Sequence, residues 1–264
     1  MPETESGSAS AIEIHMFPCL QDNYGFLLHN GATNTTATID TPEVAAIEAA
    51  LAERGWQLTH ILNTHHHYDH AGGNEELKAR HDCQVIGPKA DADRIPGIDV
   101  QLEDGQHYAF GGIELQAIDV PGHTRGHIAY YVPAAGAAFV GDTIFALGCG
   151  RLFEGTPAQM WTSIQKLMAL PDATQLYCAH EYTQANAKFA LTVDPDNAEL
   201  QKRAAEIDAL RSRGEPTVPT TLSVEKATNP FLRPAAASLQ STLGMLDADP
   251  VAVFSETRAR KDDF

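Results

Sequence analysis

One short segment, residues 64–74, constrains what this chain can fold into more than any other. Its sequence, THHHYDHAGGN, holds four side chains that can bind a metal: His65, His67, Asp69 and His70. The apolar, β-tolerant residues 58–62 precede it and predict a buried strand, and residues 75–80 predict the start of a helix. The cluster is therefore expected on a strand-to-helix loop, where α/β proteins usually place their chemistry.

The same pattern recurs three times further along the chain. Strands predicted at residues 113–120, 138–140 and 175–178 are followed within a few residues by His123, Asp142 and His180, respectively. A single His or Asp after a strand is common and by itself favours a structural role. If all these strands run in the same direction, however, their ends converge on one rim of the sheet. The joint occurrence predicts that these side chains meet in one site.

The seven candidate ligands form two sets that share one carboxylate. The first set is His65, His67, His123 and Asp142, and the second is Asp69, His70, His180 and Asp142. Asp142 is assigned to both because two carboxylate oxygens can bridge cations ~3.5–4 Å apart. Imidazoles with some carboxylate suit zinc, iron or manganese, and we expect two divalent ions per chain, with zinc favoured. Cations that share a water lower its pKa, which favours hydrolysis of an ester, an amide or a phosphodiester.

Two neighbouring histidines are expected to play other roles. His66 would point away from the metal that His65 and His67 share, so we expect it to pack or to orient a ligand. His127 is expected to hydrogen-bond the loop that carries His123. Neither set contains a cysteine, which argues against a closed structural zinc site.

Further predicted elements surround these loops. Strands are also expected at residues 12–17, 24–29, 35–40 and 128–132. Helices are expected from Pro42, with Thr41 as the N-cap, and at residues 157–170 and 195–213. Past Ala185 the pattern becomes helical, so we expect a domain boundary near that residue.

The net charge of −17 disfavours nucleic acid as a partner, because such binding relies on neutralising phosphates. Residues 200–264 carry equal numbers of acidic and basic side chains, so the whole excess lies before them. No apolar run approaches the ~20 residues of a membrane span.

Residues 1–10 are acidic and rich in small side chains, unlike a signal peptide, which predicts a flexible tail and a cytoplasmic protein. The four cysteines are scattered and predict reduced thiols.

Longer motifs restrict the families that this chain can belong to. THHHYDHAGGN, together with PGHTRGH, GDTIF and CAHEY, resembles the metallo-β-lactamase superfamily. Within it, GCGRLFEGT, HEYTQANAKFA, GEPTVPTTL, NPFLR and RARKDDF resemble glyoxalase II, the hydroxyacylglutathione hydrolases. The match covers nearly all of the chain after residue 11, and the motifs past Ala185 are the ones that favour this family within the superfamily.

This resemblance implies a fold and a division into domains. The fold is an α/β metallo-β-lactamase αβ/βα sandwich, in which two sheets pack between helices, followed by a helical C-terminal domain. We expect the catalytic domain at residues 11–185 and a helical, glutathione-binding domain at residues 186–264. A monomer that acts on a small molecule, without nucleic acid or membrane, is expected.

The resemblance also implies a reaction, the hydrolysis of S-D-lactoylglutathione and other 2-hydroxyacylglutathiones to glutathione and D-lactate. This is the second step of methylglyoxal detoxification. A hydroxide that bridges the two metals would attack the thioester, and Asp69 would orient it. Because a thiolate leaves readily, no general acid is assigned.

In the family, glutathione is held by the segment after GCG, by the tyrosine of HEY and by basic residues near the C-terminus. Carried over to this chain, these are Arg151, Leu152, Phe153, Tyr182, Arg258 and Lys261. Arg151 stands where lysine is often found, which keeps the charge but changes the geometry. Phe153 stands where tyrosine can occur, so a hydroxyl contact can be lost.

Several rival functions share parts of this pattern. A metallo-β-lactamase or lactonase is disfavoured by the C-terminal helical part with its basic residues. An RNase Z-like phosphodiesterase is disfavoured by the acidic charge balance. A persulfide dioxygenase normally holds one iron, so the second ligand set argues against it. A non-catalytic metal-binding protein would bind metal without turnover, which a complete ligand set disfavours.

Overall fold

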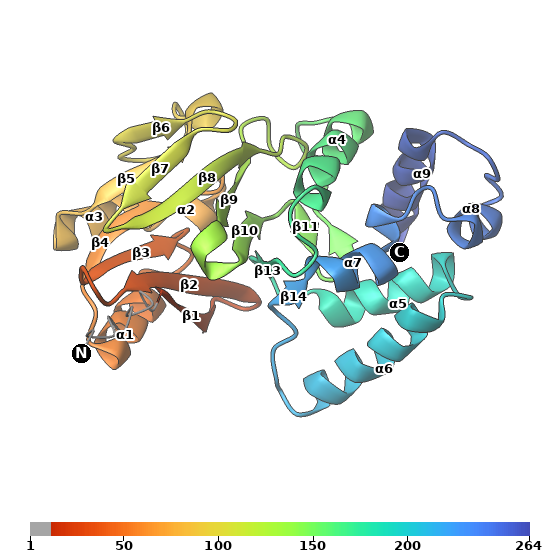
Figure 1. The fold of residues 1–264 in the computed structure, drawn as a ribbon, viewed down its shortest axis with the longest axis horizontal. Coiled ribbons are helices and arrows are strands. Elements are labelled where there is room, and N and C mark those ends of the chain that lie inside the picture. Colours follow the sequence, from red (N-terminus) through yellow and green to blue (C-terminus); the bar gives the residue numbers. More distant parts are fainter. Residues whose placement is uncertain (1–11) are drawn as a thin grey trace, which may run out of the picture.

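Two six-stranded sheets face each other in the computed structural model, which describes residues 12–264 (Figure 1). In the first sheet the strand order is β1 (Ile12–Cys19), β2 (Asn23–Asn30), β3 (Thr35–Ile39), β4 (Leu58–Leu62), β5 (Gln84–Pro88) and β6 (Val100–Leu102). In the second it is β14 (Thr220–Thr221), β13 (Gln175–Cys178), β10 (Ala137–Gly141), β9 (Ile128–Val132), β8 (Ile113–Asp119) and β7 (His107–Phe110). The tail expected at residues 1–10 lies outside the described residues.

Strand direction brings the predicted ligand loops to one edge. In the first sheet β3, β4, β5 and β6 are parallel neighbours. In the second, β8 and β10 are each antiparallel to β9, and β13 is parallel to β10, so β8, β10 and β13 share one direction. The three ligand-bearing strands of the second sheet therefore end at one rim. Because β4 belongs to the first sheet, the ligand loops converge between two sheets and not on the rim of a single sheet. A short hairpin, β11 (Ile144–Phe145) with β12 (Gly148–Cys149), follows β10 at that rim.

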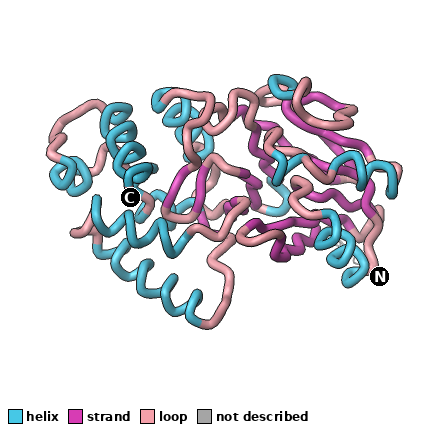
Figure 2. Tube along the Cα trace, turned by 180° about the vertical axis from the view of Figure 1, so that it is seen from behind, coloured by secondary structure: helices cyan, strands magenta, loops and turns pink. Residues whose placement is uncertain are grey.

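Helices cover both outer faces, and the C-terminal part is almost wholly helical (Figures 1 and 2). The first sheet is covered by α1 (Val44–Arg54) and α3 (Asn74–His81), and the one-turn α2 (Tyr68–Ala71) lies in the metal-binding loop. The remaining helices are α4 (Pro157–Met168), α5 (Thr183–Val193), α6 (Ala198–Ser212), α7 (Leu222–Thr228), α8 (Ala237–Leu243) and α9 (Pro250–Asp263). Three 3-10 turns lie at Lys89–Asp91, Pro133–Ala135 and Pro230–Leu232.

The main core lies between the two sheets. Along β2, Phe26 and Leu28 point into this layer while Leu27 points to the helices outside, as the two-residue period of a strand requires. The ring of Phe26 lies 5.7 Å from that of Phe139 on β10, centroid to centroid. Burying each such side chain stabilises the fold by about 1.5–3 kcal/mol, and this packing holds the two sheets at a fixed separation.

A buried carboxylate ties the helical part to the β11–β12 hairpin. Glu225 on α7 accepts hydrogen bonds from the Leu147 amide at 2.8 Å, the Thr220 hydroxyl at 2.7 Å and the Asn229 side chain at 2.9 Å. Burial raises the pKa of Glu225 despite these donors. The contact with Leu147 fixes the hairpin relative to α7, and through it one side of the site described below.

Some local expectations differ from the structure. Thr41 is not the N-cap of the first helix, because α1 begins at Val44 after Glu43. The Thr41 hydroxyl donates instead to Asn74 Oδ1 at 2.8 Å, so a contact distant in sequence replaces the local cap. The loop expected to be irregular contains α2, and α5 begins at Thr183, just before the expected boundary. Each of the four cysteines is buried and free, as expected.

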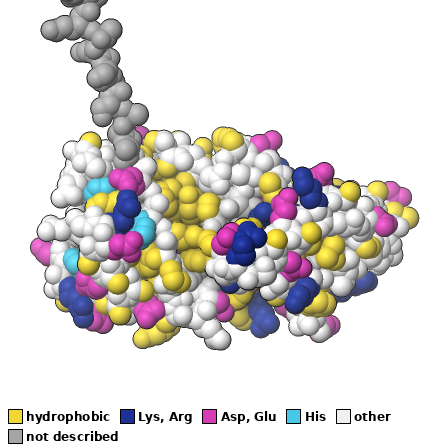
Figure 3. Space-filling view, turned by 90° about the horizontal axis from the view of Figure 1, so that it is seen from below, with side chains coloured by type: hydrophobic (Ala, Val, Ile, Leu, Met, Phe, Trp, Pro, Cys, Tyr) yellow, Lys and Arg dark blue, Asp and Glu magenta, His cyan; other side chains and the backbone are white. Residues whose placement is uncertain are grey.

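The surface carries charges of both signs. On the face seen in Figure 3, acidic and basic side chains are interspersed, and apolar side chains gather in the middle. That face therefore lacks the continuous basic stripe that nucleic-acid binding uses. Among residues 12–264, no helix is both long enough and apolar enough to cross a bilayer.

Candidate metal centre

Asp40, the residue that follows β3, holds the metal-binding loop in place. Its Oδ1 accepts a hydrogen bond from the Thr64 amide at 2.7 Å, and its Oδ2 accepts one from the Thr64 hydroxyl at 2.8 Å. The same Oδ2 accepts from His70 Nδ1 at 2.8 Å, which turns the other ring nitrogen of His70 towards the site. Sequence reasoning missed Asp40, although it follows a strand as several of the candidate ligands do.

Three histidines from two loops converge on the first group. His65 Nε2 lies 3.0 Å from His67 Nδ1, and His123 Nε2 lies 3.1 Å from the same atom. His123 Nδ1 donates to the Arg151 carbonyl at 2.9 Å, which fixes the ring and leaves Nε2 facing its neighbours. Nitrogens this close can share at most one proton, whereas a cation would take a lone pair from each.

The second group joins the metal-binding loop to the end of β13. Asp69 Oδ2 lies 3.5 Å from His70 Nε2 and 3.5 Å from His180 Nε2. Asp69 and His70 both lie on α2, and His180 follows β13. The three side chains are therefore brought together by the packing of one sheet against the other, and they form a cluster that could hold a metal ion.

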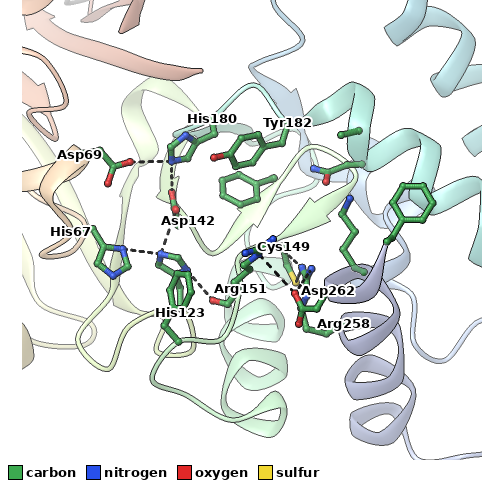
Figure 4. A pocket seen from close by; sticks show the side chains of 16 residues that line it. His67, Asp69, His123, Asp142, Cys149, Arg151, His180, Tyr182, Arg258 and Asp262 are labelled. Atoms are coloured by element: carbon green, nitrogen blue, oxygen red, sulfur yellow. Dashed lines mark hydrogen bonds and ion pairs between the residues drawn. The ribbon is translucent and has the colours of Figure 1, made fainter. Parts of the chain in front are cut away.

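Asp142 lies between the two groups (Figure 4). Its Oδ2 is 3.4 Å from His123 Nε2, and its Oδ1 is 3.4 Å from His70 Nε2 and 3.5 Å from His180 Nε2. One carboxylate oxygen thus faces each group. This is the arrangement expected of a carboxylate that bridges two cations.

Two buried atoms in this centre lack a hydrogen-bond partner among the described residues, His70 Nε2 and Asp142 Oδ1. Leaving a buried polar atom unpaired costs about 1–3 kcal/mol, more for a charged group. A divalent cation between the two would satisfy both at once. The donor set of imidazoles and carboxylates, without thiolate, therefore fits a divalent metal of the zinc, iron or manganese type.

The protonation of the centre is uneven. Burial and the surrounding imidazoles hold the pKa of His65 well below its usual value and lower that of His67 to about 4. Burial also opposes a charge on His70, but Asp142 and Asp40 outweigh it and raise the pKa of His70 to about 9. The first group therefore offers neutral nitrogens, and the carboxylates around His70 give the second group an excess of negative charge that suits a cation.

His66 and His127, which were not expected to bind a metal, have other contacts. His66 Nδ1 lies 3.0 Å from Asp91 Oδ2, so it belongs to a polar network beside the loop, as expected. His127 differs in detail from its expected role, because its Nε2 accepts from the amide of Asp142 at 3.0 Å. The ring thus holds the loop of Asp142, while the His127 carbonyl accepts from the Val120 amide, which precedes the loop of His123, at 2.8 Å.

A cavity of about 730 Å³ opens from the metal centre towards the helical part (Figure 4). Among the residues that line it are five of the predicted substrate contacts: Arg151, Phe153, Tyr182, Arg258 and Lys261. The sixth, Leu152, is not among the lining residues and packs half-buried against the core. The ring of Tyr182 stacks in parallel on that of His180, with centroids 4.8 Å apart, so it connects the metal centre to the cavity.

The basic residues of this cavity are not equivalent. Arg258 is 5% exposed, and its guanidinium donates to the Cys149 carbonyl at 2.9 Å and to Asp262 Oδ1 at 3.0 Å. It therefore supports the wall of the cavity through both terminal nitrogens, while its buried Nε has no hydrogen-bond partner among the described residues. Arg151 is exposed, and burial lowers the pKa of Lys261, whose Nζ lies 5.3 Å from the ring centre of Phe189. These two cations have more capacity left for an anionic ligand.

Comparisons with known proteins agree with this geometry. The Metallo-beta-lactamase superfamily model matches residues 35–180, and the model described as Hydroxyacylglutathione hydrolase C-terminus matches residues 181–264. The chain is 55% identical over 255 residues to a hydroxyacylglutathione hydrolase of Maricaulis maris, covering 97% of this chain and 100% of the relative. A relative of the same name from Ruegeria pomeroyi is 54% identical over 253 residues, covering 96% of this chain and 99% of the relative.

The chain belongs to the hydroxyacylglutathione hydrolase family. Among solved structures, ETHE1 from Myxococcus xanthus matches with a TM-score of 0.65 and 23% identity, covering 95% of this chain and 98% of that one. That likeness shows the fold alone, and the superfamily model over residues 35–180 confirms the expected metallo-β-lactamase architecture. The residues matched by the C-terminal model are the helical part of this chain, and that part supplies Arg258 and Lys261 to the cavity.

Proposed function

We propose that this protein hydrolyses S-D-lactoylglutathione, and other 2-hydroxyacyl thioesters of glutathione, to glutathione and D-lactate. The observation that carries the proposal is the continuity between the metal centre and a cavity lined by Tyr182, Arg151 and Lys261. A cavity of about 730 Å³ is of the size that holds a ligand such as an acylated tripeptide. The names of the relatives, which the chain matches over nearly its full length, support the same substrate class.

We further propose that the centre holds two divalent cations, with zinc favoured over iron and manganese. The first would be held by His65, His67, His123 and Asp142, and the second by Asp69, His70, His180 and Asp142. When bound, such cations lower the pKa of water and polarise a carbonyl oxygen. The unpaired His70 Nε2 and Asp142 Oδ1 support this assignment.

Asp69 is the proposed orienting group for the attacking water. Its Oδ2 faces His70 and His180, so Oδ1 can accept a hydrogen bond from the nucleophile. Burial works against the charge of Asp69, but His70 and Asn23 outweigh it and hold its pKa below the usual value. Asp69 is then ionised at neutral pH and can act as an acceptor. The thiolate product leaves without a proton donor, so no residue is assigned as a general acid.

The tripeptide part of the substrate would lie along the remainder of the cavity. Glutathione carries two carboxylates and one ammonium, and residues before 200 are strongly acidic. Arg151 and Lys261 offer local positive charge against this background, and Tyr182 and Phe153 offer apolar faces. We therefore propose that Lys261, from the helical domain at residues 186–264, and Arg151, from residues 11–185 that also carry the metal centre, together supply much of the selectivity for glutathione.

The direct test is hydrolysis of S-D-lactoylglutathione by zinc-loaded protein. Glutathione and D-lactate should appear in equal amounts, and treatment with a chelator should stop the reaction. A lactoyl thioester of a small uncharged thiol should react with a lower kcat/KM. Hydrolysis of a β-lactam or a lactone, with no thioester turnover, would overturn the proposal. The cytoplasmic location and the monomeric state remain predictions.

A further inference from the structure

The turn between β1 and β2 is joined to the segment that carries His180, although the two lie far apart in the chain. The Tyr24 amide donates to the Ala179 carbonyl at 2.7 Å, and the Glu181 amide donates to the Asp22 carbonyl at 2.9 Å. Asn23 and His180 form an isolated antiparallel bridge between these bonds. The backbone of the turn is therefore fixed against the end of β13, and the first sheet contacts the second at this point.

Asp22 in this turn and Asn23, the first residue of β2, contact two different proposed ligands. Asp22 Oδ1 lies 3.0 Å from His180 Nδ1, and the Asn23 side-chain amide donates to Asp69 Oδ2 at 3.1 Å. Asn23 is buried, and the Asp22 carboxylate is partly exposed. Both contacted residues belong to the second ligand group. The remaining member of the second group, His70, does not contact this turn. Its Nδ1 donates to Asp40, the residue after β3.

The contact with Asp22 decides which nitrogen of His180 faces the metal centre. Stacking on Tyr182 fixes the plane of the His180 ring, with an interplanar angle of 2°. A half-turn about the Cβ–Cγ bond would keep that stacking but would take Nδ1 away from Asp22. Because an ionised carboxylate only accepts hydrogen bonds, Nδ1 carries the proton and Nε2 keeps its lone pair. That lone pair then faces Asp69 and Asp142, each 3.5 Å away.

We propose that Asp22 and Asn23 are positioning residues for the second metal site and have no such role at the first. This inference rests on the proposed two-ion assignment. The described contacts of the first group run to other residues: His123 to the Arg151 carbonyl and His65 Nδ1 to the Thr64 hydroxyl at 3.1 Å. Loss of the Asp22 or Asn23 side chain should therefore weaken the binding of the second ion and leave the binding of the first unchanged.

The experiment is a chelator titration of the zinc-loaded full chain, with bound zinc measured by elemental analysis. In Asp22→Asn, which keeps the shape but removes the charge, one of two ions should leave at about 10- to 100-fold lower chelator concentration. Asn23→Ala should release the same ion early. The other ion should leave as in the parent. Gln21→Ala, a change in the same turn that removes no described contact with a ligand residue, should behave as the parent.

A second readout separates positioning from loss of structure. The variants should keep the circular dichroism of the parent, and excess zinc should restore thioester turnover in Asp22→Asn. If Asn23→Ala does not fold, the chelator titration of Asp22→Asn alone tests the positioning role. The inference is overturned if Asp22→Asn releases both ions together, or if it releases neither ion earlier than the parent does. A parent protein that binds only one ion would overturn both the inference and the two-ion assignment. Early loss of one ion in a protein without thioester activity would support it and contradict only the proposed function.

Discussion

His127 Nε2 accepts a hydrogen bond from the backbone amide of Asp142 at 3.0 Å. Its lone pair is thereby used, which explains why a fully buried histidine beside the centre is not among the candidate ligands. The contact also fixes the backbone of Asp142 where β10 ends. At Gly141, just before it, the backbone φ is +48°, and a Cβ would come within 2.6 Å of His127 Nε2. Only glycine lets the two loops approach this closely.

Replacing Asp142 with alanine should remove both metal ions, because each of its oxygens faces one group. His180→Ala should mainly weaken binding of the ion at the second site. The loss of kcat/KM in Asp142→Ala should exceed the ~10- to 100-fold that typically follows loss of a residue that only orients a ligand. Metal content by elemental analysis checks the prediction. As a control, His66→Ala should keep both ions, and retention of both by Asp142→Ala would show that it is not the bridge.

Lys261→Ala should raise the KM for S-D-lactoylglutathione about 10-fold or more with little change in kcat. A charge-assisted contact is worth about 1.5–3 kcal/mol, and this one lies away from the scissile bond, so it acts similarly on ground and transition states. Arg151→Ala should behave in the same way. A small uncharged thioester should be turned over at nearly the parent rate, and Lys202→Ala on α6 serves as the control. Equal losses on both substrates would contradict the assignment.

Arg258→Ala should act differently, because its guanidinium is buried and already paired. We expect the free energy of unfolding to fall by about 1.5–3 kcal/mol, through loss of hydrogen bonds to a charged group. Activity on the charged and uncharged substrates should fall together. Urea unfolding of Arg258→Ala and Lys261→Ala side by side measures the difference. Selective loss of the glutathione substrate in a fully stable Arg258→Ala protein would instead assign this residue to substrate binding.

Glu154→Gln should cost stability at neutral pH but not in strong acid. Hydrogen bonds from the Arg94 guanidinium, helped by the Arg125 amide, lower the pKa of Glu154 from its ordinary 4.5 to about 2. The stabilisation is therefore present above pH ~4.5 and is lost as the pH falls through about 2. Because the pair is partly exposed, we expect a difference of about 1 kcal/mol at pH 7. Urea unfolding in chelator at pH 7, 4 and 2 checks this, with the exposed Glu53→Gln on α1 as the control. A difference that stays constant across this range would rule out the charge as its cause.

The sequence by itself predicted which side chains cluster and that they follow the ends of strands. His65, His123, Asp142 and His180 could be found because apolar strand patterns are local, and each ligand follows its strand closely. The family could be found because its motifs are contiguous. The same local reasoning failed for the Thr41 cap, since the Thr41 hydroxyl contacts Asn74 on a different helix.

Only the tertiary structure shows which residues contact the candidate ligands and which cations of the cavity are already paired. Asp22 looks like an ordinary turn residue, and its partner His180 lies 158 positions away. Arg258 looks like a solvated charge near the end of the chain, yet it packs beneath the Cys149 carbonyl, 109 positions away. Periodicity and spacing report which face of an element is buried, but they carry no record of hydrogen bonds between elements that packing brings together.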